Sequence, residues 1–103
     1  MSQLENVNLS TTGNVYFDGK CVSYTFHTAD GTRKSVGVIQ PAQLTFGTAA
    51  PEIMELQQGR CRVKIAGEDA FKAYAGGDSF SVAGDSSFDI EVLEDVHYVC
   101  HYG

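Results

Sequence analysis

The chain has little positive charge, little proline and no long hydrophobic run. Its 103 residues include 7 lysines and arginines against 13 aspartates and glutamates, which gives a formal net charge of −6. Because nucleic-acid binding requires a basic face that neutralises phosphates, no nucleic-acid polymer is expected as a partner. No apolar run reaches the 18 residues of a membrane span, so no membrane association is expected. A pocket can still carry a local positive field, which leaves small anionic ligands open.

Cysteine is also scarce, with only Cys21, Cys61 and Cys100. The number is odd, the spacings are wide and no C-x-x-C motif occurs, so neither a disulfide framework nor a zinc site is expected. Residues 1–10 lack the basic start and the apolar run of a signal peptide. These features favour a reduced, cytoplasmic setting.

Apolar and polar residues alternate with a period of two through most of the chain. Residues 22–26, 61–65 and 88–92 show the pattern clearly, and it is typical of strands with one face on a core. Turn signals such as Asp30-Gly31 separate these runs at short intervals. Many short strands in a chain of this length predict one all-β domain, a sandwich or a barrel.

The expected domain layout is simple. Residues 1–13 are polar and rich in turn formers, which predicts an N-terminal arm or an extra edge strand, and residues 14–103 form the barrel. Residues 51–58 are the only stretch that could be helical, since proline suits the first position of a helix. Their apolar spacing fits a strand about as well, and we favour a turn followed by a strand.

A degenerate cupin pattern lies in the middle of the chain. Glu52 and Gly59, with six residues between them, match the end of the first cupin motif. The two histidines that normally precede this glutamate would fall within residues 45–48, where there is none. The last ligand position of the second motif falls at Ser87. Hydroxyls are poor ligands for transition metals, so a barrel without the usual metal chemistry is predicted.

Seven short runs, in order and at the right spacing, make a more specific pattern. They are Tyr16-Phe17-Asp18-Gly19-Lys20, Ser35-Val36-Gly37-Val38-Ile39, Thr45-Phe46-Gly47-Thr48 with Pro51-Glu52-Ile53-Met54, Tyr74-Ala75-Gly76, Phe80-Ser81-Val82, Ser87-Phe88 and Tyr98-Val99-Cys100-His101-Tyr102. Together they resemble the small cupin family of pyrimidine/purine nucleoside phosphorylases, over residues 14–102. The resemblance implies a cupin barrel that splits purine and pyrimidine nucleosides with inorganic phosphate, yielding a free base and a pentose 1-phosphate, without a cofactor.

This reaction makes demands that can be matched to residues. Phosphate must be held beside the anomeric carbon by cations or by N–H and O–H donors, and the leaving base needs a proton or a hydrogen bond. The hydroxyls of Thr45, Thr48 and Ser87 occupy the usual metal-ligand positions and could bind phosphate or ribose. They could equally be surface residues of their strands.

Charged candidates are Glu52, Lys20 and Arg33. Glu52 could bind ribose hydroxyls or act as acid or base, or it could cap the turn beside Pro51. Lys20 and Arg33 flank family-like segments and are the leading phosphate-binding candidates, although either could be a solvated cation at the end of a strand.

Aromatic residues and one histidine complete the predicted site. Tyr98 is a catalytic candidate, because a buried tyrosine hydroxyl usually has a partner. His101 could act as acid or base near neutrality, or be an edge histidine. The aromatic residues that could form a slot for the base are Tyr16, Phe17, Phe46, Phe88, Tyr98 and Tyr102, and most of them could instead pack in the core.

Two other functions stay open at this point. The barrel could be a non-catalytic module that binds a sugar, a nucleoside or phosphate, or a metal-dependent cupin with unusual ligands such as Glu52, His27 and His101. A homodimer is expected, because pairing edge strands across a twofold axis is a common solution for a small barrel.

Overall fold

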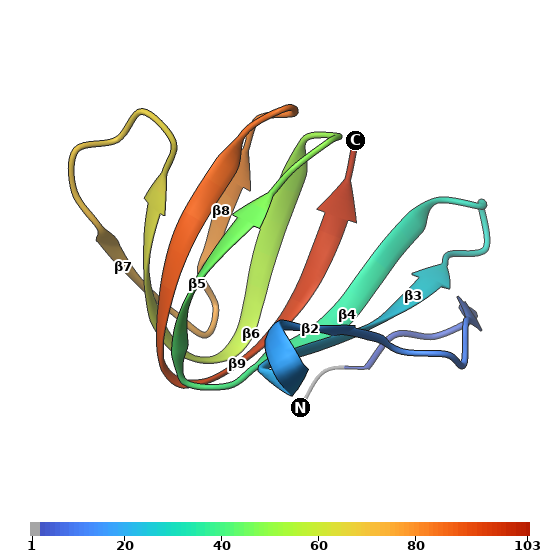
Figure 1. The fold of residues 1–103 in the computed structure, drawn as a ribbon. Helices are drawn as coiled ribbons and strands as arrows, with labels where there is room; N and C mark the ends of the chain where they lie inside the picture. The colour runs from blue at the N-terminus through green and yellow to red at the C-terminus, as the bar shows by residue number, and fades with distance from the viewer. Residues whose placement is uncertain (1–2) are drawn as a thin grey trace.

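A computed structural model describes residues 3–103 of the chain (Figure 1). The described part consists of one curled antiparallel sheet and a single short 3₁₀ turn. The elements are β1 (Asn8–Leu9), β2 (Asn14–Tyr16), η1 (Phe17–Gly19), β3 (Cys21–His27), β4 (Arg33–Ile39), β5 (Ala42–Gly47), β6 (Glu52–Ile65), β7 (Lys72–Ala75), β8 (Ser79–Val82) and β9 (Ser87–Tyr102). The prediction of one all-β domain is confirmed, as is the strand in place of a helix after Pro51.

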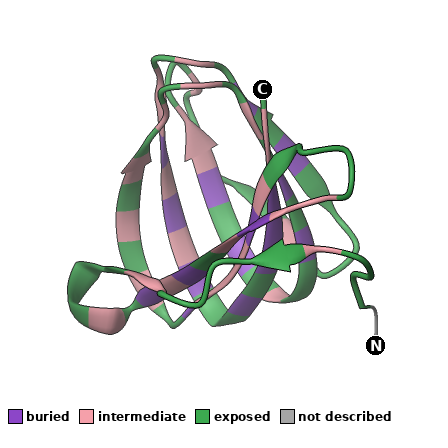
Figure 2. Ribbon diagram, turned by 90° about the vertical axis from the view of Figure 1, so that its right-hand side faces the viewer, coloured by how far each residue is buried: buried purple, intermediate pink, exposed green. Residues whose placement is uncertain are grey.

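Two long strands, β6 and β9, pair along most of their length and organise the barrel. On its other edge, each of these two strands pairs with one strand along its first half and with another strand along its second half. The first half of β9 pairs with β5 and the second half with β4, while the first half of β6 pairs with β8 and the second half with β7. The sheet therefore curls around a core, as Figures 1 and 2 show.

Alternate residues of these strands fill the interior. On β9 the buried side chains include Phe88, Ile90 and Val92, and on β6 they include Cys61 and Val63. Their neighbours in sequence point outward, which gives the alternating purple and green bands of Figure 2. Burial of this apolar set is the main contribution to stability.

In strand β3, a polar residue of the alternating pattern faces the interior of the barrel, and apolar residues face outward. Its serine, Ser23, is buried and lines an internal cavity, whereas Val22 and Tyr24 line a groove on the outer face of the sheet. Alternation therefore predicted the strand correctly without revealing which face is inside. The reversal arises because Ser23 faces a cavity inside the barrel that also contains the carboxyl group of Glu52.

The N-terminal segment extends one edge of the sheet, beyond β3. Its strand β1 pairs with Phe26 and His27 of β3, and β2 pairs with the beginning of the same strand. The described part of the chain holds no helix with the length and hydrophobicity that a membrane crossing requires.

Candidate active site

A cavity of about 150 Å³ opens between the strands β3 and β4 on one side and the long strands β6 and β9 on the other. Side chains from six strands reach it. The lining residues are Tyr16, Ser23, Ile39, Phe46, Gly47, Glu52, Met54, Tyr98, Cys100 and Tyr102. Three of them, Phe46, Glu52 and Tyr98, are site residues that the sequence predicted.

Glu52 is the carboxyl group of this cavity. It begins β6, directly opposite Tyr102 of β9, so the strand register turns both side chains to the same side. The thiol of Cys100 donates a hydrogen bond of 3.6 Å to its Oε1. Partial burial raises the pKa of Glu52, and the Cys100 hydrogen bond and the charge of Arg33 partly offset that rise. A carboxyl group in this environment is suited to carry and release a proton.

Arg33 reaches the cavity through Tyr102. The guanidinium carbon lies 4.2 Å from the centre of the Tyr102 ring, a cation–π arrangement. The Tyr102 hydroxyl is in turn 3.0 Å from Oγ of the buried Ser35. This chain of contacts holds an exposed cation beside the cavity that contains Glu52.

Tyr98 lies deeper, with its ring against the glycine backbone of β4. A Cβ atom at Gly37 would lie 2.6 Å from the Tyr98 hydroxyl, so only glycine leaves room for the ring. The hydroxyl lies 3.7 Å from Sγ of Cys21. Burial raises the pKa of Tyr98 far above its usual value, so the hydroxyl stays protonated and can donate to a bound ligand.

Phe46 connects the cavity to a row of aromatic rings. Its ring centre is 5.4 Å from that of Phe88, in a stacked arrangement, and 5.1 Å from that of Phe17, edge to face. Phe88 is buried in the core and is absent from the cavity lining. Phe46 is therefore the ring of this predicted pair that a ligand in the cavity could touch.

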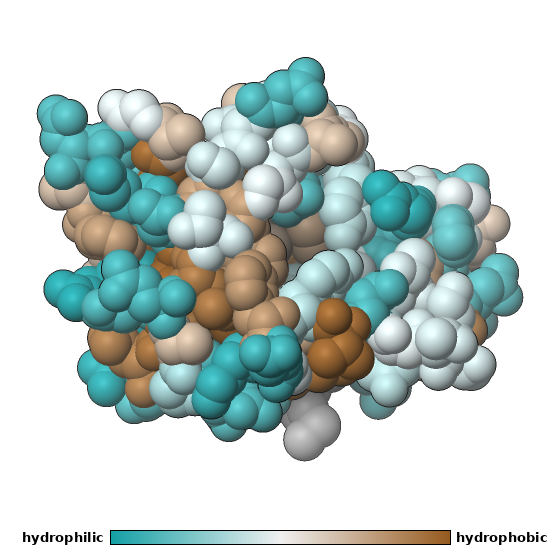
Figure 3. Space-filling model, viewed as in Figure 1, coloured by the Kyte–Doolittle hydropathy of each residue, from teal (hydrophilic) through white to brown (hydrophobic). Residues whose placement is uncertain are grey.

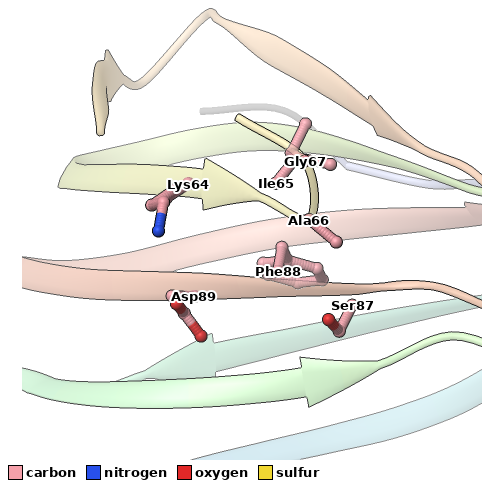
Figure 4. A pocket seen from close by; sticks show the side chains of 7 residues that line it. All are labelled: Lys64, Ile65, Ala66, Gly67, Ser87, Phe88 and Asp89. Carbon is pink, nitrogen blue, oxygen red and sulfur yellow. The ribbon is translucent and has the colours of Figure 1, made fainter. Parts of the chain in front are cut away.

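The three hydroxyls expected in the barrel mouth do not line the cavity. Thr45 points away from Phe46 and donates to Asp89 at 2.7 Å on the exposed surface. Thr48 donates to the carbonyl of Ala83 at 2.6 Å and so fixes a loop. Ser87 lines a separate pocket of about 60 Å³, where β6 ends and β9 begins (Figure 4).

Lys20 and His101 also lie outside the cavity lining. His101 alternates with Cys100 and Tyr102, so it faces the other side of β9, where its Nδ1 is 2.6 Å from Nζ of Lys34. Lys20 connects η1 to β3 and is exposed. Within residues 3–103, no three His, Cys, Asp or Glu side chains are grouped so that they could hold a metal ion.

Tyr102 was among the aromatic candidates, whereas sequence reasoning assigned no role to Ser23, which lines the cavity, or to the buried Ser35. Ser23 was interpreted as part of the polar side of its strand. The pairing register gave the available signal, since Tyr98, Cys100 and Tyr102 recur at every second position of one strand. Residues spaced in this way share one face.

With this geometry established, comparison with known proteins identifies the family. The family described as pyrimidine/purine nucleoside phosphorylase matches residues 11–102. The chain belongs to that family. Among its relatives, a pyrimidine/purine nucleoside phosphorylase of Nocardia farcinica is 62% identical over 103 residues, covering all of both chains. The family resemblance drawn from the seven sequence runs is confirmed.

Solved structures confirm the cupin-type barrel. A protein of unknown function from Acinetobacter sp. ADP1 superposes with a TM-score of 0.95 at 46% identity, covering 98% of both chains. A putative ethanolamine utilization protein from Salmonella typhimurium LT2 superposes with a TM-score of 0.68 over 93% of this chain and 95% of its own. At 14% identity, the second likeness shows the shared fold alone.

Proposed function

We propose that this protein of the nucleoside phosphorylase family cleaves both purine and pyrimidine nucleosides with inorganic phosphate, at the cavity that contains Glu52. The observation that carries the proposal is one juxtaposition. A partly buried carboxyl group with a raised pKa lies in the same cavity as Tyr102, whose ring holds the Arg33 guanidinium. Phosphorolysis needs such a proton donor together with an anion-binding group.

The proposed chemistry uses these groups in order. Phosphate binds at Arg33 and attacks the anomeric carbon, forming a C–O bond while the bond from that carbon to the base nitrogen breaks. The bonding electron pair goes to the base, and the Glu52 carboxyl group supplies the proton that the base takes up. Glu52 then regains a proton from the newly esterified phosphate. The transition state has oxocarbenium character, so exact placement of phosphate contributes most of the rate.

Tyr98 is assigned a binding role in this scheme. Its protonated hydroxyl and that of Ser23 face the cavity and could donate to pentose hydroxyls. Cys100 is assigned no chemical step, because burial and the neighbouring Glu52 raise the pKa of its thiol to about 12. A thiol with that pKa stays protonated at neutral pH.

The decisive experiment follows base release from uridine and inosine. We expect release that requires phosphate, yields pentose 1-phosphate in equal amount and persists after treatment with EDTA. Loss of activity in EDTA that zinc, manganese or iron restores would overturn metal independence. Binding of nucleosides without any turnover would favour the non-catalytic module.

Replacing Arg33 is expected to weaken phosphate binding. A hydrogen bond to a charged group contributes about 1.5–3 kcal/mol, so Arg33→Met should raise the KM for phosphate by about tenfold to 100-fold. Arg33→Lys should restore part of the loss, because it keeps the charge without the planar guanidinium. Steady-state kinetics with phosphate as the varied substrate measures both.

Arg60→Met is the matched control for this variant. Arg60 is also an exposed arginine on a strand, but it pairs with Glu94 at 3.0 Å, away from the cavity. Its replacement should leave the KM for phosphate unchanged. Equal effects of the two variants would remove Arg33 from the scheme.

We infer a homodimer in the reducing cytoplasm. The outer face of the sheet has a groove of about 810 Å³, and its lining includes Val22, Tyr24, Val36, Val38 and Val99. A second copy of the chain could cover this largely apolar surface. The three cysteines are free and buried, which supports a reducing setting. Light scattering of the parent protein should give twice the mass of one chain. The Val38→Glu variant should give the mass of a single chain. A monomeric parent protein would refute the dimer.

A further inference from the structure

The cavity is smaller than a nucleoside requires. Sites that enclose a ligand of drug size measure about 300–1,000 Å³, whereas this cavity measures about 150 Å³. The polar groups that suit a pentose, Glu52, Ser23 and Tyr98, all lie inside it. If the pentose occupies this space, the base must lie at the rim.

Exposed aromatic rings lie at that rim. Tyr16 lines the cavity and is 46% exposed, and Phe17, next in the chain, is 42% exposed. The Phe17 ring packs edge to face on Phe46, which also lines the cavity. In the view of Figure 3, hydrophobic surface gathers on the left-hand part of the molecule, in the region where Figure 1 shows β5. Tyr16 and Phe46 thus line the cavity from two separate segments, and Phe17 packs on Phe46 beside them.

The backbone that carries Phe17 is strained. Phe17 and Asp18 have φ angles of 52° and 54°, in the left-handed region, and Gly19 follows with 91°. A bulky residue rarely adopts this conformation, and such outliers persist where the surrounding structure imposes them, often at binding sites. Here a hydrogen bond of 3.1 Å from the Lys20 N–H to the Phe17 carbonyl closes the turn. An unstrained turn would serve if its only task were to connect β2 to β3.

We propose that Tyr16, Phe17 and Phe46 form a stacking platform that binds the nucleobase outside the cavity. This inference rests on the proposed function, since it names where that reaction holds the base. Every base has a π face, so stacking on aromatic rings tolerates purines and pyrimidines alike. A base held at the rim by stacking needs few base-specific hydrogen bonds. Its position outside the cavity would therefore explain why both purine and pyrimidine nucleosides are accepted.

Two variants test the platform. Phe17→Asn removes the ring and places in the turn a residue that adopts the left-handed conformation readily. Tyr16→Leu keeps an apolar side chain on extended backbone, with φ −123° and ψ 152°, so it carries the test if Phe17→Asn does not fold. Each should raise the KM for inosine and uridine by between about fivefold and 100-fold. The KM for phosphate should stay within about twofold of the parent value.

Phe71→Leu is the control, because Phe71 is a comparably exposed aromatic residue (38%) that lies outside both the cavity lining and the outer groove. It should leave all three KM values unchanged. If the parent protein is active and the folded variants have its KM values for nucleosides, the platform is refuted and the proposed function remains intact. If the parent protein has no phosphorolytic activity, the proposed function fails by itself. Calorimetric titration with inosine then decides the platform, which requires weaker binding in both variants and unchanged binding in Phe71→Leu.

Discussion

Replacing Glu52 with glutamine should lower kcat by a factor of about 10² to 10⁴, the usual contribution of a general acid. Glutamine keeps the size and the hydrogen bonding of the side chain but cannot supply a proton to the leaving base. The KM for phosphate should change little, because the Arg33–Tyr102 contact remains. Steady-state kinetics with inosine at saturating phosphate measures the loss.

The same residue predicts a pH dependence with a definite sign. Burial raises the pKa of Glu52 above its ordinary value, and the proton donor is active only while protonated. The parent protein's kcat should therefore fall as the pH rises through that raised pKa, and Glu52→Gln should show no such fall. Glu55→Gln is the control, since Glu55 lies on the same strand and is exposed outside the cavity. A Glu52→Gln variant with full activity would refute the assignment.

The Glu52→Gln substitution should lower activity without lowering the stability of the folded protein. Because the folded-state pKa of Glu52 lies above the unfolded value, the ionised carboxyl group destabilises the folded state once the pH exceeds the unfolded pKa. At pH 7–8 the Glu52→Gln protein should thus be at least as stable as the parent. This pattern is typical of a residue retained for function at a cost in stability.

Gly59→Ala should destabilise the fold by about 3 kcal/mol. Gly59 has a φ of 101° and lies where the pairing of β6 with β9 shifts register. A Cβ atom here would meet the carbonyl oxygen of Asp95 and lie 2.9 Å from Cα of Val96. Overpacking against backbone costs about 1–3 kcal/mol, and the left-handed conformation adds about 1 kcal/mol or more.

Urea denaturation measures the effect of this change, and thermal melting should show a loss of about 12–24 °C. Gly67→Ala is the matched control. Gly67 has a φ of 91° in a turn, with no atom within 4 Å of a Cβ there. It should lose only the conformational part, about 1 kcal/mol. Equal losses at the two positions would show that the close approach of β6 to β9 is unimportant.

The fold was predictable where apolar residues alternate beside clear turns. Phe88, Ile90 and Val92 fall on the buried face of β9 as expected, and Asp30-Gly31 lies in the turn between β3 and β4. Glu52 was proposed from the motif spacing and Phe46 as an aromatic residue for the base slot, and both side chains line the cavity. Local pattern is sufficient for such elements, because period two fixes which residues share a face.

The polar half of the site was less predictable. Alternation assigns residues to two faces but cannot say which face is concave, so Thr45 was expected in the mouth and Ser23 outside it. The Arg33–Tyr102 contact joins residues far apart in sequence and depends on the pairing of β4 with β9. His101 looked suitable by chemistry, and only the register shows that it faces away from Glu52. These features depend on long-range pairing, which a single sequence does not display.

A crystal structure with ribose 1-phosphate bound tests the central claim most directly. The account predicts the pentose in the cavity between Glu52 and Tyr98, with the phosphate within hydrogen-bond distance of the Arg33 guanidinium. A phosphate held instead beside Lys64 and Ser87, in the small pocket of Figure 4, with no sugar at Glu52, would contradict it.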